Sequence, residues 1–420
     1  KCIYYLDNTG NRKILLNKEI ISKDIDNEAK TGSRIIFLTL KDKHSTSHTY
    51  LGYLVIKDTI RKTTVTSINI LHNAGINVIM ITGDNIDTAT SIAKESGIIT
   101  NKNDLSLTSK EFNSLSDEEI SNLYSRIKVI ARALPKDKSR MVKILQNMDL
   151  IVGMTGDGIN DAGALKTADV GFAMGSGTEV AKEASDIIIL DDNIKSITKA
   201  ILFGRTIFKS IRKFIIFQLT VNICAMLMAI LGPIFDITTP VTVIQMLWIN
   251  MIMDTLAGIA FANEPPLSEY MLEAPKTKDI PIINSYMFKE ILFTGLYTSL
   301  LGIFFLKSNF VYNFIRYSSD YRYLYTAYFA FFIFSALFNA LNARTTRLNI
   351  LANITKNKPF IFIFTGITIV QIYLIYYGGD LFRTYGLTVK ELLFVVLLSL
   401  SVIPIDWLRK SMIKKETKKL

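Results

Sequence analysis

The sequence predicts an α/β domain built on a doubly wound parallel sheet, followed by an α-helical bundle of six transmembrane helices. The chain has 420 residues, of which 49% are hydrophobic. After about residue 210, apolar stretches of about 18–22 residues recur, and each is long enough to cross a ~30 Å hydrocarbon core. Before that point, short apolar runs alternate with segments of helical spacing, which is the pattern of a parallel sheet covered by helices.

The elements of the α/β domain follow one another in that alternating order. Residues 1–50 mix strand-like runs, such as Ile35–Leu40, with polar turns. Further strands are predicted at Leu51–Ile56, Val78–Ile81, Lys128–Ala131 and Leu150–Met154. Helices are predicted at Val65–Ala74, Asn85–Glu95 and Lys138–Gln146.

The six spans are predicted at residues 214–233, 241–262, 289–306, 324–342, 359–377 and 391–408. Six spans return the chain to its starting side, so the basic loop around Arg344 and Arg347 and the basic C-terminal run lie on the side of the α/β domain. The positive-inside rule makes that side cytoplasmic, although Lys307, Arg316 and Arg322 on the opposite side count against it. The expected regions are 1–50, an α/β domain over 51–200, a stalk helix over 201–213, the membrane bundle over 214–408 and a basic cytosolic tail over 409–420.

The charge pattern favours a membrane flank over a nucleic-acid partner. The formal net charge is +11, and the basic residues include a closing run over Lys410–Lys419 beside an apolar span. Such a run fits lipid headgroups better than a DNA-reading face. Cys2 and Cys224 lie far apart and match no metal or disulfide framework.

The strongest chemical signal is the eight-residue run Met154–Asp161 (MTGDGIND), which follows an apolar strand. Ligands bind at the carboxyl ends of parallel strands. Asp157 and Asp161, four residues apart around a glycine-rich turn, can hold Mg²⁺, which takes only one or two protein carboxylates. Asn160 can orient an acid or a phosphate oxygen. The alternative is an Asp/Gly turn that caps a helix.

Two weaker signals precede that run. Thr82, Gly83 and Asp84 follow the strand Val78–Ile81 at a helix N-terminus, where backbone N–H groups can cradle a phosphate. An ordinary N-cap by Thr82 or Asp84 explains them equally well. Lys138 opens a further helix and can neutralise charge on a transferring phosphoryl group, or it is simply an exposed surface lysine.

The order Thr-Gly-Asp, then Lys, then Gly-Asp-Gly-x-Asn-Asp resembles the second, third and fourth motifs of the haloacid-dehalogenase-like phosphoryl-transfer fold. Their wording is similar to that of the P-type ATPases, which use ATP and Mg²⁺. Arg34, after Gly32-Ser33, resembles the arginine that contacts ATP near the end of the nucleotide-binding domain, so residues 1–50 would be the tail of that domain.

The resemblance also implies a missing nucleophile. The family's first motif, Asp-Lys-Thr-Gly-Thr, carries the aspartate that becomes phosphorylated, and no such string occurs in these 420 residues. Family order places it before residue 1. We therefore expect this chain to be a fragment that needs the N-terminal half of the same pump as its partner and is inactive alone.

Polar residues at membrane depth are the candidate ion ligands. Asn222 lies in the first span, and Asn250 and Asp254 lie four residues apart in the second, on one helix face. Intramembrane ionisable groups are costly and mark functional sites, and amide and carboxylate oxygens suit a hard cation. A helix–helix hydrogen bond is the alternative for Asn222.

The sequence segments around these residues, notably Gln245–Thr255 and Asn263–Pro266, resemble those of the plasma-membrane type of calcium pump. The sarcoplasmic reticulum type binds two calcium ions with additional oxygen ligands, at positions that here are Ala225, Met253 and Ala336. The resemblance therefore implies one Ca²⁺ site, formed by Asn250 and Asp254 with ligands from an upstream span, and leaves Asn222 doubtful as a ligand.

The resemblance implies a multi-pass protein that exports Ca²⁺ from the cytosol, at the plasma membrane or else at a vacuolar or other internal membrane. Few residues follow the last span, and Lys410–Lys419 lacks a bulky apolar face, so we expect lipid contact and no calmodulin binding. Three alternatives stay open: a pump for another cation, a tethered phosphatase domain, and a non-catalytic, separately encoded half.

Overall fold

The computed structural model describes residues 2, 4–7, 9–30, 34–41, 48–56, 60–237 and 240–416. It divides into two compact units, each described by itself below. The first contains residues 1–202 and 268–280, and the second contains residues 203–267 and 281–420.

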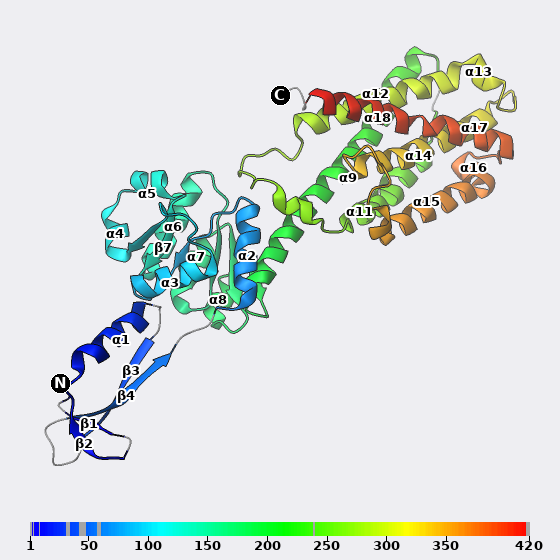
Figure 1. Ribbon diagram of the computed structural model, residues 1–420. Coiled ribbons are helices and arrows are strands. Elements are labelled where there is room, and N and C mark those ends of the chain that lie inside the picture. Colours follow the sequence, from blue (N-terminus) through cyan, green and yellow to red (C-terminus); the bar gives the residue numbers. More distant parts are fainter. Residues whose placement is uncertain are drawn as a thin grey trace. The chain divides into compact units, whose positions relative to one another are not determined.

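A small mixed sheet opens the first unit. Its strand order is β2-β1-β4-β3, with β1 Tyr4–Leu6, β2 Arg12–Ile14, β3 Arg34–Leu40 and β4 Thr49–Ile56. β3 and β4 are antiparallel neighbours, and α1 (Lys18–Lys30) lies beside β3 (Figure 1). The strands predicted at Ile35–Leu40 and Leu51–Ile56 are confirmed, but β4 pairs with β3 and not with the parallel strands that follow.

The remainder of the first unit is an α/β arrangement with two three-stranded parallel sheets, of order β5-β7-β6 and β10-β9-β8. The strands are β5 Met80–Ile81, β6 Leu105–Thr108, β7 Ile127–Ala131, β8 Gly153–Gly156, β9 Val170–Met174 and β10 Ile187–Ile189. The helices between them are α2 Lys62–Asn73, α3 Ile86–Ser96, α4 Ser109–Ser114, α5 Asp117–Leu123, α6 Pro135–Asn147, α7 Ala162–Thr167 and α8 Glu179–Glu183. All-parallel pairing confirms the predicted fold class.

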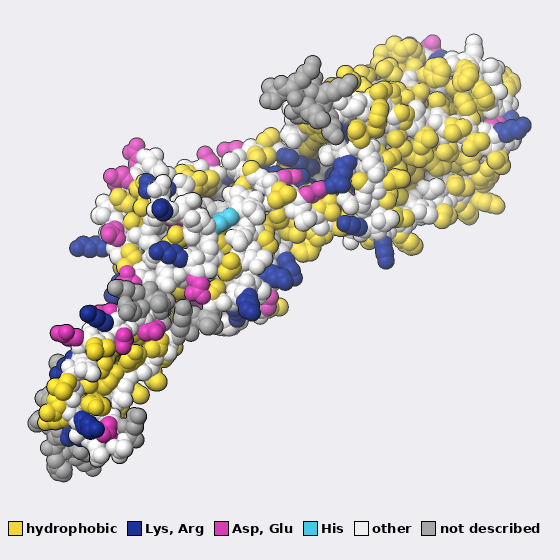
Figure 2. Space-filling model, viewed as in Figure 1, with side chains coloured by type: hydrophobic (Ala, Val, Ile, Leu, Met, Phe, Trp, Pro, Cys, Tyr) yellow, Lys and Arg dark blue, Asp and Glu magenta, His cyan; other side chains and the backbone are white. Residues whose placement is uncertain are grey.

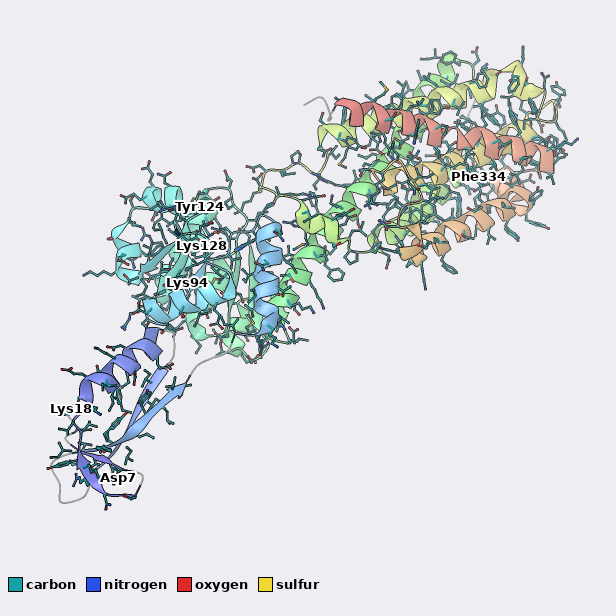
Figure 3. All side chains as sticks on the ribbon, in the orientation of Figure 1. Asp7, Lys18, Lys94, Tyr124, Lys128 and Phe334 are labelled. Carbon is teal, nitrogen blue, oxygen red and sulfur yellow. The ribbon has the colours of Figure 1, made fainter. Side chains whose placement is uncertain are left out.

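β7 is the buried centre of the first parallel sheet. Val129 and Ala131 pack with α2 and α3 on one face, while Ile127 and Ile130 pack with α4, α5 and α6 on the other. A register irregularity opposite Lys128 separates Ile127 from Val129, so the strand does not alternate regularly. Lys128, labelled in Figure 3 near Tyr124, donates to Asn77 Oδ1. A strand covered on both faces needs apolar residues in succession, which the sequence supplies.

The predicted strand at Leu150–Met154 begins late. The Leu150 amide donates to Leu145 O (3.2 Å) and so closes the end of α6, and Asp149 adopts a left-handed φ of 58°. Residues committed to a helix C-cap cannot enter the ladder, so β8 starts at Gly153. The strand predicted at Val78–Ile81 likewise shortens to Met80–Ile81.

The second unit is a bundle containing six helices long and apolar enough to cross a membrane, and the chain is accordingly a multi-pass integral membrane protein. These spans lie at Ile194–Ile234, Val243–Ala262, Ser285–Lys307, Arg322–Arg344, Lys358–Tyr377 and Val389–Met412. The expected stalk over 201–213 lies inside α9 (Ile194–Ile234), which is one continuous helix. The second span is divided into α10 (Val243–Leu247), the π-helix η2 (Trp248–Met253) and α11 (Asp254–Ala262).

The other spans are α12 (Ser285–Lys307), α14 (Arg322–Arg344), α15 (Lys358–Tyr377) and the pair α17 (Val389–Leu400) and α18 (Val402–Glu416). Hydrophobic side chains cover most of the visible face of this unit (Figure 2). α14, which carries the labelled Phe334 in Figure 3, is the most buried span, with 83% of its apolar window inside the bundle. It is therefore the helix around which the others pack.

A buried ionic cluster joins the middle of α9 to the ends of α11 and α14 and the start of α15. Glu264, just after α11, accepts from Lys213 of α9 (Nζ–Oε2 2.8 Å) and from Asn357 Nδ2 at the start of α15 (3.1 Å). Arg344 at the end of α14 lies 3.6 Å from Glu264 Oε1 and donates to the carbonyls of Ile350 and Ala352. Removing one member of such a cluster leaves an uncompensated buried charge, so Glu264 holds these four helices together.

A second buried cluster joins α12, α14 and α18. Arg409 pairs with Glu290 (3.0 Å) and Asp406 (2.7 Å), and Lys410 pairs with Asp406 (2.8 Å). Lys410 Nζ also donates to the carbonyls of Asn342 and Thr345, both at 2.8 Å. These basic residues are therefore structural, whereas Lys414, Lys415, Lys418 and Lys419 of the predicted lipid-binding run have side chains outside the described residues.

We predict that Glu264→Gln lowers the free energy of unfolding by about 3–5 kcal/mol, because it leaves the buried cations Lys213 and Arg344 without a carboxylate. Thermal unfolding of the purified protein in detergent measures the change. Asp320→Asn is the matched control, because the Asp320–Arg322 pair (2.7 Å) is about half exposed and its loss costs about 0–1 kcal/mol. Equal effects of the two substitutions would contradict a stabilising role for the Glu264 cluster.

Candidate functional site

Asp161 organises the loop that follows β8. It ends the short 3₁₀ helix η1 (Ile159–Asp161) and is buried. Its Oδ2 accepts from the backbone amides of Asp157 (3.3 Å) and Gly158 (3.2 Å), while its Oδ1 pairs with Lys138 Nζ of α6. The structure thus joins two predicted site residues, Lys138 and Asp161, from separate elements, and Lys138 is not a free surface lysine.

Asp157 presents its side chain to solvent on a fixed backbone. Its carbonyl accepts from the amide of Thr178 (2.8 Å), which caps α8. A Cβ at Gly156 would lie 2.4 Å from Asp161 Cβ, and one at Gly177 would lie 2.9 Å from Asp157 O. Glycine is therefore required at both positions by close approach of the chain. Asn160 is also exposed on this loop, so both side chains are available to a ligand.

The Thr82–Asp84 loop is held at the carboxyl ends of β5 and β7. Backbone amides of Arg132 and Ala133 donate to Asp84 O and Thr82 O, both at 2.9 Å. The Thr82 hydroxyl donates to Asp84 Oδ2 (2.9 Å) and accepts from the Asp84 amide (3.2 Å). The capping role considered for Thr82 or Asp84 is wrong, because Asn85 caps α3 by accepting from the Thr88 amide (2.8 Å). Gly83 and Asp84 are exposed, and Thr82 is partly buried.

The two loops belong to different sheets. β5 pairs only with β7 and β8 only with β9 among the described strands, so each is an edge strand. Within the described residues, no hydrogen bond or ion pair joins Thr82 or Asp84 to the 157–161 loop. Arg34 begins β3, where it is paired with Ile56, but its side chain lies outside the described residues.

Asp137 is a positioning residue that the sequence reasoning missed. It is fully buried, and its carboxylate accepts from Ser109 Oγ (2.6 Å), Asn113 Nδ2 (2.8 Å) and the Leu134 amide (2.9 Å). Burial raises its pKa, but these hydrogen bonds outweigh burial and hold the pKa below its ordinary value. It therefore fixes the first turn of α6, and with it Lys138, against α4. The available signal was an acidic residue in the first turn after Pro135.

The candidate ion ligands of the membrane unit occupy contrasting environments. Asp254 is 3% exposed, and neither carboxylate oxygen has a hydrogen-bond partner within the described residues. Asn250 and Asn222 are exposed on the bundle surface. Asn250 lies in the π-helix η2, a rare conformation that is frequent at functional sites. The regular helix face expected to carry both Asn250 and Asp254 is therefore interrupted, and the two side chains differ in burial.

The sites differ in what they can bind. Among the described residues, no group of three or more His, Cys, Asp or Glu side chains forms a closed metal cage. Mg²⁺ needs no such cage, so the exposed Asp157 carboxylate fits a magnesium ion that keeps most of its waters. An isolated carboxylate at membrane depth needs a cation or a proton, so Asp254 fits an ion site completed by other groups.

Three family models together match most of the chain. A model described as a haloacid dehalogenase-like hydrolase matches residues 8–169, and a second of the same description matches residues 151–201. A model described as the C-terminus of cation transporting ATPases matches residues 238–412.

Curated relatives match across both units. "Calcium-transporting ATPase 2" of Schizosaccharomyces pombe is 40% identical over 80% of this chain and 26% of its own length. "Calcium-transporting ATPase 3, plasma membrane-type" of Oryza sativa is 36% identical over 96% of this chain and 40% of its own. "Plasma membrane calcium-transporting ATPase 1" of Homo sapiens is 35% identical over 96% of this chain and 36% of its own. The chain thus spans between a quarter and two-fifths of these relatives.

We predict that Asp137→Asn lowers the free energy of unfolding by about 1–3 kcal/mol at pH 7, because buried donors lose a charged acceptor. Because the folded-state pKa of Asp137 is depressed, this stabilisation is present above the ordinary carboxyl pKa of about 3.9 and is lost as pH falls through the folded value. The gap between wild type and variant should therefore narrow towards pH 3 in thermal melts. Asp87→Asn, in the exposed first turn of α3, is the control and should change little. A gap independent of pH would contradict the assignment.

Proposed function

Because the chain belongs to the cation-transporting ATPases of the P type, we propose that it forms the catalytic and ion-binding part of a pump that uses ATP to export Ca²⁺ from the cytosol. The observation that carries the proposal is the Asp254 carboxylate, which lies in a membrane span, is 3% exposed and has no hydrogen-bond partner within the described residues. The same chain carries the loop in which Lys138 pairs with Asp161, the proposed phosphoryl-transfer site. A tethered phosphatase needs no buried carboxylate at membrane depth.

The soluble unit would perform phosphoryl transfer from ATP to an aspartate. Lys138 would neutralise the phosphoryl oxygens, and its pairing with Asp161 holds its ammonium at the loop that carries Asp157. Thr82, Gly83 and Asp84 would form the phosphate-binding loop, Asn160 would orient the phosphate oxygens, and Arg34 would contact the nucleotide. Asp157 would hold Mg²⁺, which supplies positive charge at the phosphoryl oxygens.

The phosphorylated aspartate of the proposed cycle comes from a further segment of the pump. The motif loops follow β5 and β8, and both strands have an unpaired edge within the described structure. A strand added at either edge would bring its carboxyl end beside these loops, because parallel strands end together. The non-catalytic half therefore remains the second candidate function, and a search for Asp-Lys-Thr-Gly-Thr in the natural protein separates the two.

The membrane unit would bind one Ca²⁺ per cycle. Asp254 supplies one negative charge and Asn250 a neutral oxygen, and a further ligand set would come from a span outside this chain. Ala225, Met253 and Ala336 offer no side-chain oxygen for a second ion. The Asn222 side chain is exposed on the bundle surface, so Asn222 stays a doubtful ligand. The plasma membrane is the proposed location, since two of the relatives described above carry that name.

We predict that Asp157→Asn abolishes phosphoenzyme formation from radiolabelled ATP and Mg²⁺ in a protein that contains this chain and its phosphorylated aspartate. The loss of the exposed carboxylate removes the proposed magnesium ligand. Glu179→Gln is the control, because the Glu179 side chain is 81% exposed on the neighbouring helix α8 and should leave phosphorylation normal. Wild-type phosphoenzyme in Asp157→Asn would refute the site.

We predict that Asp254→Ala abolishes Ca²⁺-dependent phosphorylation from ATP, while inorganic phosphate still phosphorylates the variant because the soluble site is intact. Thr255→Val, on the exposed side of the same turn, serves as the control. Bound ⁴⁵Ca per phosphorylation site should be close to one in the reconstituted protein. A ratio near two would rule out the single site, and activation by another cation without calcium would change the proposed substrate.

A further inference from the structure

A small cavity lined by both polar and apolar side chains lies between α9, α12 and α14 of the second unit. Its lining includes Thr220 and Cys224 of α9, Thr298 of α12, and Ser335, Ala336 and Asn339 of α14. Its volume is about 20 Å³. A cavity needs about 10–15 Å³ on the same measure to hold one water molecule, so the space suits one water and little more.

Two of the lining groups are buried without a partner. Ser335 is 1% exposed and Asn339 is 5% exposed, and neither Ser335 Oγ nor Asn339 Nδ2 has a hydrogen-bond partner within the described residues. A buried polar group without a partner loses its hydration and gains nothing in return. Native proteins resolve such cases mostly with buried water, which makes two to four hydrogen bonds.

The other lining hydroxyls complete the hydrogen-bonding capacity of the cavity. Thr220 Oγ1 and Thr298 Oγ1 donate to the carbonyls of Ile216 (2.7 Å) and Thr294 (2.8 Å), four residues earlier on their own helices. Their protons are therefore committed, and their oxygens remain as acceptors. The cavity thus offers donors from α14 and acceptors from α9 and α12, and only a ligand that both donates and accepts satisfies all of them.

The chemistry of the lining excludes most other small ligands. The lining contains no carboxylate and no basic side chain, so a divalent cation or an anion would be buried without a counter-charge. The Asn339 amide N–H₂ group also repels a monovalent cation at the same position. Water has the right size, charge and combination of donor and acceptor sites.

We propose that this cavity binds one ordered water molecule, held by Ser335 Oγ and Asn339 Nδ2 as donors and by the hydroxyl oxygens of Thr220 and Thr298 as acceptors. The water would join α9, α12 and α14 through one hydrogen-bonding network. The water site is separate from Asp254, and the proposal does not depend on whether the chain transports calcium.

The first test is a density map of the purified protein at a resolution that shows water. The expected result is a single peak within hydrogen-bond distance of both Ser335 Oγ and Asn339 Nδ2. An empty cavity overturns the proposal. Replacing sodium and potassium in the buffer by rubidium or thallium before imaging provides the second outcome, because a heavier peak in the cavity would identify a monovalent cation and overturn the proposal too.

The second test uses the sign of a stability change. With water bound, Ser335→Ala removes a satisfied hydrogen bond and should lower the melting temperature by about 2–4 °C. In a dry cavity, the same substitution removes an unsatisfied hydroxyl and should raise the melting temperature. Ser299→Ala is the matched control, because Ser299 is equally buried, does not line the cavity and donates to Gly295 O (2.7 Å). Ser299→Ala should lower the melting temperature because it removes a satisfied hydroxyl, so a melting temperature of Ser335→Ala that rises or stays at the wild-type value refutes the bound water.

Discussion

The constraint on which this structure depends is that a carboxylate removed from water must be matched by donors or cations. The described residues contain seven buried acidic side chains: Asp137, Asp161, Asp254, Glu264, Glu290, Glu391 and Asp406. Six of them have hydrogen-bond or ion-pair partners within the chain, and each of the six fixes a loop or joins helices. Asp254 has none. Matched carboxylates build the scaffold, and the unmatched one marks the place where a ligand is needed.

The same rule shapes the proposed phosphoryl-transfer site. The carboxylates of Asp161 and Asp137 are fully engaged in contacts within the protein. Asp161 accepts hydrogen bonds from two loop amides and pairs with Lys138, and Asp137 accepts hydrogen bonds from side chains of α4 and so joins α4 to the first turn of α6. Their burial leaves Asp157 and Asn160 exposed on a rigid backbone. A site assembled in this way is preorganised, because the groups that orient the loop are not the groups that meet the ligand.

In the membrane unit, the buried polar features range from ion-pair clusters to a cavity lined by neutral groups. Glu264 and the Glu290–Asp406–Arg409–Lys410 cluster hold helices together with ion pairs, whereas the α9–α12–α14 cavity is lined by neutral side chains. α9 takes part in both arrangements through Lys213 and Thr220, and it begins among the core residues of the first unit through Ile197. This helix therefore contributes both to the Glu264 cluster and to the α9–α12–α14 cavity.

The sequence alone determined the fold class, the six spans and the identity of the motif loops. Membrane helices can be predicted from sequence because hydrocarbon offers no hydrogen-bond partners, so the backbone must form its own hydrogen bonds within a helix. The Gly-Asp-Gly-x-Asn-Asp run can be recognised because its residue types suit phosphate and Mg²⁺. Tertiary structure alone decided which polar residues are satisfied. That Asp161 pairs with Lys138 and that Asp137 is buried against α4 depend on contacts between segments distant in the chain, and that Leu150 closes α6 reflects competition between helix and strand for the same amide. Local sequence spacing does not encode such contacts, because the same short sequence can place a carboxylate in solvent or against a second helix.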